Sequence, residues 1–556
     1  MTTAFELADQ IVDAGCALDP VLCTQLGIPG SDHEWGDSFG LAGVEQRHRL
    51  HQRFRPLVEP HASREDPSDR IAARVMLSAF DESSQGFAEL DHFRDLRHMG
   101  SSFHKIRMTF DVMRHGTPEE RDHISRRLDT LEKPLGDYRE LLEAGISAGV
   151  VVAARQVRSV IEQARRISRQ PSSIDDIVNK AQGADGPSAA LTAAADRARS
   201  AYEEFADWLE RRYLPVASGE NGVAPETYAR SADRLVGMPV DLDEAYRWGW
   251  HEFDRLRDEL KRVAELIRPG EGVLATKDYL EIDPAETAAG PAELISFVER
   301  TLAGAVDDLA GTHFDVPAAI RPLTVQMAPA GGPLGVYYRR PSEDLSRPGG
   351  VWYSIGDQQV FPLYQHVSTA YHEGFPGHHL QIATAMHRRD RISRFQRLLT
   401  WCPGYGEGWA MYAEVLMGEL GYLEDPRYYF GMLAKQMYRA ARVVVDIGLH
   451  LRMPIDRGSP LAPGESWSYE TAVEFMRVYG FRTPDQARDE VLRYLGWPAQ
   501  AITYKLGERK ILRMRETARA HLGSQFDLRS FHSNILQNGT MRLDLLDEVV
   551  GWRLGE

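Results

Sequence analysis

The chain contains few cysteines. Three occur among its 556 residues, at positions 16, 23 and 402. Their spacing matches neither a disulfide framework nor a cysteine-based zinc site. We expect Cys402 to be a buried, inert thiol. This cysteine usage favours a reducing compartment.

Long apolar stretches are also missing. No window of 18 or more apolar residues occurs, so we expect no membrane helix and no membrane partner. The N-terminal segment Met1–Glu6 has neither a basic start nor an apolar stretch, which argues against a signal peptide. Together with the cysteine usage, these features predict a cytoplasmic protein.

Basic residues are outnumbered by acidic ones. The chain has 65 lysines and arginines against 81 aspartates and glutamates, which gives a net charge of -16. No stripe of basic residues with interleaved aromatics occurs either. The sequence therefore predicts no nucleic-acid partner.

What is present is helical periodicity. Apolar residues recur at three- and four-residue intervals, as at Tyr246, Trp250 and Phe253, which predicts a mainly α-helical fold. A chain of this length ordinarily divides into two or more domains or lobes. The predicted helices are 118–132, 135–167 (as one helix or with an interruption), 188–213, 242–267, 291–309, 358–374, 378–388, 407–420, 426–451, 468–479, 483–495 and 502–522.

The segment 371–381 carries the strongest functional signal. Glu373 follows His372 directly, and His378 and His379 come six and seven residues after His372. Histidines with a neighbouring carboxylate are the parts of a mononuclear zinc site with a general base. His372 is therefore a predicted metal ligand and Glu373 the predicted base for the attacking water.

The spacing differs from that of the usual zincin motif, whose two histidines lie four residues apart on one helix. Here Pro376 occupies the fourth position after His372 and would break the helix. We expect one helix to end near Gly374 and a second to start at His378. Gly377 permits the tight corner between them, which can bring His378 back beside His372.

His378 and His379 are neighbours in the second helix and point about 100° apart, so we expect one of them to bind the metal. His378 is the favoured metal ligand. The other histidine would support a ligand or contact the substrate.

The segment 406–414 contains two further carboxylate residues. Glu407 and Glu414 are seven residues apart, so they share one helix face. Glu407 is the favoured third ligand. Glu414 is the alternative ligand, or else an acceptor for a ligand histidine.

A hydrogen-bond donor to the developing oxyanion would complete such a site. Tyr504 is the favoured donor, and Tyr494 and Lys505 are weaker candidates; Lys505 is also a candidate for substrate binding. Zinc is preferred over iron or manganese for a His/His/Glu ligand set.

Strand signal is confined to 323–327, 335–339 and 351–355, directly before the metal-binding segment. An exposed edge strand there can pair with an extended peptide, although an ordinary structural hairpin is the alternative. The loop between the first two strands contains Gly331 and Gly332, which we assign to substrate binding.

The motifs 372–381 and 407–414 and the segment 499–507 resemble a bacterial family catalogued as domain of unknown function 885. Its members look distantly related to helical gluzincin peptidases of the thimet-oligopeptidase type. The resemblance implies His372, His378 and Glu407 as ligands and Glu373 as base. Two extra residues precede His378, and Ala499 stands where the family has glycine.

The sequence thus predicts a zinc metallopeptidase that cleaves short peptides in a deep cleft between two helical lobes. Residues 1–320 would form a helical N-terminal lobe and 321–556 a catalytic lobe with a small sheet. The alternatives are a zinc amidohydrolase or isopeptidase acting on a non-peptide amide, and a non-catalytic zincin-like scaffold that binds peptides. The sequence does not indicate the oligomeric state.

Overall fold

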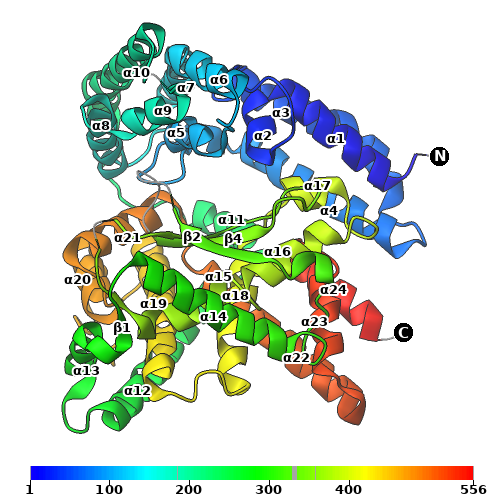
Figure 1. The fold of residues 1–556 in the computed structure, drawn as a ribbon, viewed down its shortest axis with the longest axis vertical. Helices are drawn as coiled ribbons and strands as arrows, with labels where there is room; N and C mark the ends of the chain where they lie inside the picture. The colour runs from blue at the N-terminus through cyan, green and yellow to red at the C-terminus, as the bar shows by residue number, and fades with distance from the viewer. Residues whose placement is uncertain (1, 185, 329–334, 357, 555–556) are drawn as a thin grey trace. The chain divides into compact units, whose positions relative to one another are not determined.

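The computed structural model describes residues 2–184, 186–328, 335–356 and 358–554. Within these residues the protein is mainly helical with a small sheet, as predicted (Figure 1). By packing, the chain divides into two compact units. Among the described residues, the first comprises residues 2–221 and the short segment 393–399, and the second comprises the remainder. This division follows packing alone, so the functional boundary near residue 320 stays a prediction.

The first unit is a bundle of helices. They are α1 (Ala4–Leu18), α2 (Pro20–Leu26), α3 (Leu41–Val58), α4 (Pro67–Ala88), α5 (Ser102–Val112), α6 (Pro118–Asp129), α7 (Glu132–Ser147), α8 (Ala154–Ser168), α9 (Ser173–Ala181), α10 (Ala189–Trp208) and α17 (Arg394–Leu399).

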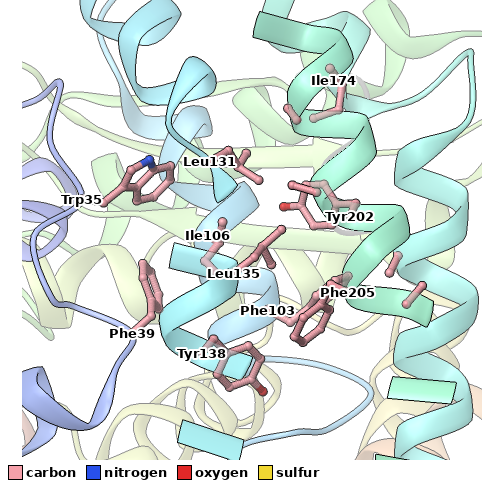
Figure 2. Packing of buried hydrophobic residues seen from close by; sticks show 14 of the residues in the cluster. Trp35, Phe39, Phe103, Ile106, Leu131, Leu135, Tyr138, Ile174, Tyr202 and Phe205 are labelled. Atoms are coloured by element: carbon pink, nitrogen blue, oxygen red, sulfur yellow. The ribbon is translucent and has the colours of Figure 1, made fainter. Parts of the chain in front are cut away.

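Aromatic side chains of α5, α7 and α10 form the centre of this bundle (Figure 2). The ring of Phe205 stacks on Phe103 and on Tyr138, with centroids 6.1 and 5.6 Å apart. Burial of these large apolar rings is the main source of stability in this helical bundle.

The second unit combines helices with two small sheets. Its helices are α11 (Pro225–Val236), α12 (Leu242–Ile267), α13 (Gly272–Ile282), α14 (Pro291–Leu309), α15 (His366–Glu373), α16 (His378–His387), α18 (Pro403–Glu419), α19 (Pro426–Leu451), α20 (Tyr469–Tyr479), α21 (Pro484–Gly496), α22 (Thr503–Leu522), α23 (Leu528–Leu536) and α24 (Leu543–Leu554). None of the described helices combines the length and apolar character needed to cross a bilayer.

The larger sheet has the strand order β2 (Leu323–Met327), β4 (Gly349–Ser354), β3 (Gly335–Arg339). β4 runs parallel to β2 and antiparallel to β3. The first two strands therefore do not form a hairpin with each other, and β3 is an edge strand that packs against α15.

The helix predicted over 358–374 is shorter than expected, because α15 begins at His366. The preceding residues Phe361 and Pro362 form β5, which pairs with β1 (Thr287–Ala288). Proline has no N–H to donate, and it disfavours helical backbone at the residue before it. The apolar periodicity alone did not reveal this boundary.

Helices α18 and α22 approach closely through glycines. A Cβ on Gly408 would lie 2.5 Å from the carbonyl carbon of Gly507, and one on Gly507 would lie 2.0 Å from the oxygen of Gly404. Because no side chain separates the two backbones, the position of α18 is determined by direct backbone packing.

We predict that Gly507→Ala lowers the free energy of unfolding by about 1–3 kcal/mol, since the added methyl group overpacks this contact. The matched control is Gly304→Ala on the exposed face of α14, where a Cβ meets nothing within 4 Å. This control should raise stability by about 0.5–1 kcal/mol through helix propensity. Chemical denaturation measures both; equal midpoints would contradict the close packing.

Candidate metal centre

A tight corner joins α15 and α16. The first helix ends at Glu373 and the second begins at His378, as predicted. The Phe375–Pro376 peptide bond between them is cis. A Cβ on Gly377 would lie 2.0 Å from the carbonyl oxygen of His372, so only glycine allows the chain to fold back this closely.

Helix α18 is attached to this corner. The buried Trp409 donates a hydrogen bond from Nε1 to the carbonyl oxygen of Pro376, at 2.9 Å. This bond attaches α18, the helix that carries Glu407, to the corner that carries the two histidines.

The corner and α18 bring three potential ligands together. One ligand atom from each of His372, His378 and Glu407 lies within 4.8 Å of the other two. Nε2 of His372 and Nε2 of His378 are each 3.5 Å from Oε2 of Glu407. The two imidazole rings are 4.9 Å apart and nearly perpendicular.

These distances fit a metal ion better than direct hydrogen bonds. A nitrogen–oxygen separation of 3.5 Å is long for a hydrogen bond. Zinc binds nitrogen and oxygen at roughly 2.0–2.1 Å, so neighbouring ligands around a tetrahedral ion lie roughly 3.3–3.4 Å apart. The two histidine-to-Glu407 distances are thus close to the separation expected of two ligands of one zinc ion.

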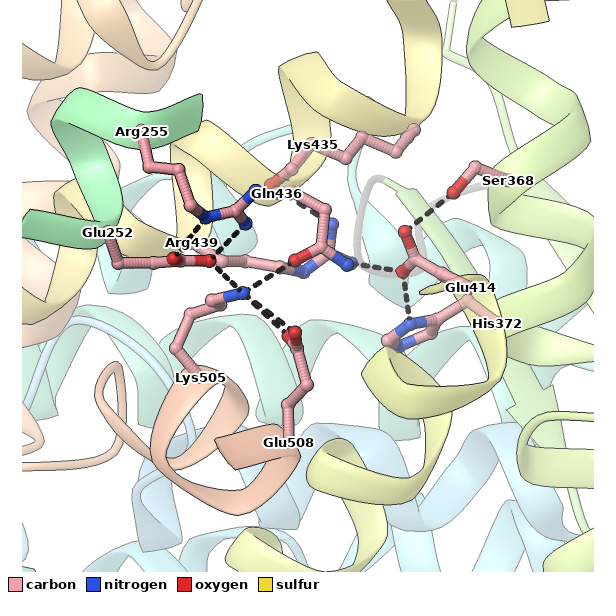
Figure 3. A network of polar contacts seen from close by, with 10 residues as sticks. All are labelled: Glu252, Arg255, Ser368, His372, Glu414, Lys435, Gln436, Arg439, Lys505 and Glu508. Carbon is pink, nitrogen blue, oxygen red and sulfur yellow. Dashed lines mark hydrogen bonds and ion pairs between the residues drawn. The ribbon is translucent and has the colours of Figure 1, made fainter. Parts of the chain in front are cut away.

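Glu414 orients one of these ligands. Its Oε1 lies 2.7 Å from Nδ1 of His372, and its Oε2 accepts a 2.6 Å hydrogen bond from Ser368 (Figure 3). Glu414 is fully buried. A carboxylate on Nδ1 places the proton there and leaves the Nε2 lone pair free for a metal. Glu414 is thus placed as an acceptor for His372 and is not one of the three clustered residues.

The charges in the cluster favour a positive centre. Burial opposes ionisation of Glu407, yet contacts with His372 and His378 hold its pKa well below the usual range. Burial opposes the charged form of His372, but the contacts with Glu407 and Glu414 favour it more strongly. The net effect raises the pKa of His372 to about 9. Negative carboxylates thus surround the point where a cation would sit.

His379 is placed outside the cluster. Its Nε2 lies 2.8 Å from the carbonyl oxygen of Ile320, and its Nδ1 lies 3.0 Å from the hydroxyl of Tyr338. Burial lowers the pKa of His379 to about 4, so the ring is neutral. Because both nitrogens have other partners, His379 is not the alternative ligand; it ties α16 to strand β3.

Glu373 lines a pocket of about 280 Å³ next to the cluster. Burial raises the pKa of Glu373, whereas His372 and His378 oppose this shift. The remaining wall is built from β3, β4, α15 and α19. The predicted base thus lies between the candidate ligands and a space that can hold a small molecule.

Tyr504, the predicted oxyanion donor, is close enough to Glu407 for the charge of that carboxylate to affect it. Burial and then the charge of Glu407 raise its pKa, so its hydroxyl remains a neutral donor. The guanidinium carbons of Arg442 and Arg439 lie 4.9 and 5.7 Å from the centre of its ring. The weaker candidate Tyr494 is almost fully buried.

Lys505 does not line the pocket. Its ammonium group donates to Gln436 at 2.8 Å and pairs with Glu252 at 3.0 Å and with Glu508 at 2.8 Å (Figure 3). The side chain is 1% exposed. The prediction that Lys505 binds substrate is therefore wrong: it links α12, α19 and α22 inside the unit. Gly331 and Gly332 lie outside the described residues.

Some residues around the site were not assigned a functional role from the sequence. Lys435, Arg439 and Arg482 line the pocket. The indole of Trp401 lies 6.2 Å from the ring of His378 and is 47% exposed. Lys435 and Arg439 are one turn apart on α19, which could have marked a basic face; Arg482 and Trp401 carry no comparable local signal.

Fold and site together define a mainly helical protein in which His372, His378 and Glu407 form a cluster that could hold a metal ion. The chain belongs to the family described as bacterial proteins of unknown function (DUF885), which matches residues 20–550. The resemblance to this family is thereby confirmed.

Two solved structures share the fold. A "putative lipoprotein" from Colwellia psychrerythraea is 21% identical with a TM-score of 0.82, over 100% of both chains. A "putative lipoprotein of unknown function" from Shewanella oneidensis is 14% identical with a TM-score of 0.73, over 99% of this chain and 100% of that one. At these identities the likeness shows the fold alone. No curated protein matches the chain.

We predict that Glu414→Gln weakens zinc binding by roughly 10- to 100-fold, since the carboxylate that orients His372 is lost. Competition with a chromophoric chelator measures the affinity, with circular dichroism as a check on folding. Glu424→Gln, at an exposed position beyond α18, is the control and should bind zinc as the parent does. Unchanged affinity in Glu414→Gln would contradict the orienting role.

Proposed function

We propose that the protein is a zinc-dependent hydrolase, a zincin-like metallopeptidase that cleaves short peptides. The observation that carries this proposal is that ligand atoms of His372, His378 and Glu407 lie within 4.8 Å of one another, with Glu373 beside them on a pocket wall. Two nitrogen ligands and one oxygen ligand leave a fourth position for water or substrate, as catalytic zinc sites do. When bound, zinc supplies a Lewis acid that polarises the substrate carbonyl and acidifies water.

Glu373 is the residue that moves protons. As general base it accepts a proton from the attacking water, and as general acid it donates that proton to the leaving nitrogen. Its position on the pocket wall lets it reach a substrate that approaches the ligands from that side.

Tyr504 supplies a neutral donor. As the carbonyl oxygen gains negative charge, a phenol hydroxyl positioned toward it stabilises that charge without losing its proton. The cationic side chains against its ring keep the surroundings positive, which favours the same charge.

A peptide substrate is favoured by strand β3. Within the described residues this strand pairs with β4 alone, and Gly335 and Val336 line the pocket. An extended peptide can add to such an edge by main-chain hydrogen bonds, whatever its side chains.

Two rival functions use the same residues. An amidohydrolase or isopeptidase would cleave a non-peptide amide with the same ligands, and cleavage of acylated amines but not peptides would favour it. A non-catalytic peptide-binding scaffold would hold zinc without turnover, but it has no need of a carboxylate placed as Glu373 is. A substrate-library screen of the zinc-loaded protein separates the three.

The cytoplasmic location expected from the sequence stays a prediction. Both solved neighbours are named as lipoproteins, a class attached to membranes through a covalent lipid, so a membrane-attached location is the alternative. Cell fractionation separates the two.

We predict that Glu373→Gln keeps its zinc but loses roughly 10²- to 10⁴-fold in kcat, because the proton acceptor is removed. Elemental analysis gives the metal content, and peptide hydrolysis gives the rate. Chelation of the parent protein should abolish the activity and added zinc should restore it. Full activity in Glu373→Gln would refute the mechanism.

We predict that Tyr504→Phe lowers kcat by roughly 10²- to 10³-fold with little change in KM, because the hydroxyl acts on the transition state. Tyr494→Phe is the matched control: the hydroxyl of Tyr494 is buried and has no hydrogen-bond partner among the described residues. Steady-state kinetics of both variants provide the test. Equal rates for the two would exclude Tyr504 as the donor.

A further inference from the structure

Basic side chains outnumber acidic ones in the pocket beside Glu373, although burial and the charges of Arg439 and Arg482 lower the pKa of Lys435 to about 7. Lys435 and Arg439 of α19 line it, together with Arg482, which follows α20. Among the described lining residues Glu373 is the one carboxylate. The lining also contains His366, whose pKa burial lowers to about 3, so its ring adds no charge.

Among the described residues, two of the three basic side chains have no hydrogen-bond or ion-pair partner. The guanidinium of Arg439 lies 3.7 Å from the carboxylate of Glu414. In the part of the chain that the structure describes, neither Lys435 nor Arg482 makes a hydrogen bond or ion pair through its side chain. Arg482 instead lies over the ring of Tyr438, 3.9 Å from its centre, and its buried Nε has no partner.

Such an arrangement is costly unless something compensates for it. Withdrawing a cation from water without a counter-charge is unfavourable, so an uncompensated group at a pocket wall marks a site for an anion. Arginine and lysine side chains bind carboxylates through charge-assisted hydrogen bonds, and the arginine fork matches a carboxylate in shape.

The position of the pocket identifies which half of a substrate would occupy it. Glu373, which returns the proton to the leaving nitrogen, shares the lining with His372 and the three cations. Trp401 lies by His378 and is not part of this lining. The half of the substrate that carries the leaving nitrogen therefore lies over the basic pocket.

We propose that Lys435, Arg439 and Arg482 bind the free C-terminal carboxylate of the substrate, so that the protein removes carboxy-terminal residues from short peptides. This inference rests on the proposed function. Water adds its oxygen to the carbonyl carbon and the carbon–nitrogen bond breaks. One proton of that water passes through Glu373 to the nitrogen, and the second is also taken up by the released amine, which leaves as an ammonium group while the shortened peptide keeps a new carboxylate.

The size of the pocket agrees with a short leaving group. Its volume of about 280 Å³ lies at the lower limit of ligand pockets, which span roughly 300–1,000 Å³. A leaving group of one or two residues fits this space, with the carboxylate at the cations and the nitrogen toward Glu373.

The test compares N-acetyl-Ala-Ala-Phe as the free acid and as the C-terminal amide, with zinc-loaded protein. We expect kcat/KM to be roughly 10- to 100-fold higher for the acid, since only the acid makes charged hydrogen bonds. Lys435→Met should bring the acid-to-amide ratio toward one, mainly by raising KM for the acid. Lys261→Met, at an exposed position on α12, is the control and should leave the ratio unchanged.

A binding measurement separates this inference from the proposed function. Titration calorimetry with Glu373→Gln should show the same preference for the acid without turnover. Equal binding of acid and amide would overturn the carboxylate pocket, even if the parent protein hydrolyses both peptides. A preserved preference for the acid in a parent protein that hydrolyses nothing would instead refute the proposed function alone.

A third comparison distinguishes a terminal carboxylate from an acidic side chain. Amidated peptides ending in glutamate and in glutamine should bind Glu373→Gln about equally well. Tighter binding of the glutamate peptide, with no preference for a free terminus in the first pair, would overturn the proposal in favour of an acidic side chain.

Discussion

The site depends on one imidazole held between two carboxylates of the same helix. Glu407 and Glu414 lie two turns apart on α18, and His372 is placed between them with Nε2 toward the first and Nδ1 toward the second. This determines which nitrogen carries the proton and which way the other points. His378 completes the set only because the corner at Pro376 returns the chain to the same place.

That arrangement requires α18 to be held rigidly. Glycine contacts fix it against α22, and Trp409 fixes it to the corner between α15 and α16. Ligand geometry of this kind tolerates little displacement, so the supporting helices matter as much as the ligands do. The buried ion pair of Lys505 with Glu252 serves the same end, because it joins α22 to α12.

The two sides of the cluster differ in chemistry. On the Glu373 side, basic residues surround a small pocket, and on the His378 side an exposed indole stands beside the ligand. A substrate would thus be recognised by charge on one side and by apolar contact on the other. Strand β3 borders the pocket and offers main-chain groups to an extended peptide. Hydrogen bonds to these groups would set both the direction and the register of the bound peptide.

Much of this was predictable from the sequence, because it depends on local patterns. The bounds of α12, α14 and α19 agree with their periodicity, since each is a long amphipathic helix. The corner follows from Pro376 and Gly377, whose backbone restrictions act within a few residues. The shared face of Glu407 and Glu414 is a direct consequence of helix geometry.

Tertiary contacts decided the rest. His378 and His379 are adjacent and chemically identical, and His379 is excluded by Tyr338 and Ile320, which lie 41 and 59 residues away in the chain. The partners of Lys505 and the convergence of Arg482 with Lys435 likewise join segments remote in sequence. The sequence by itself determined which side chains could act, because helix and turn preferences are local; packing between distant segments decided which of them meet.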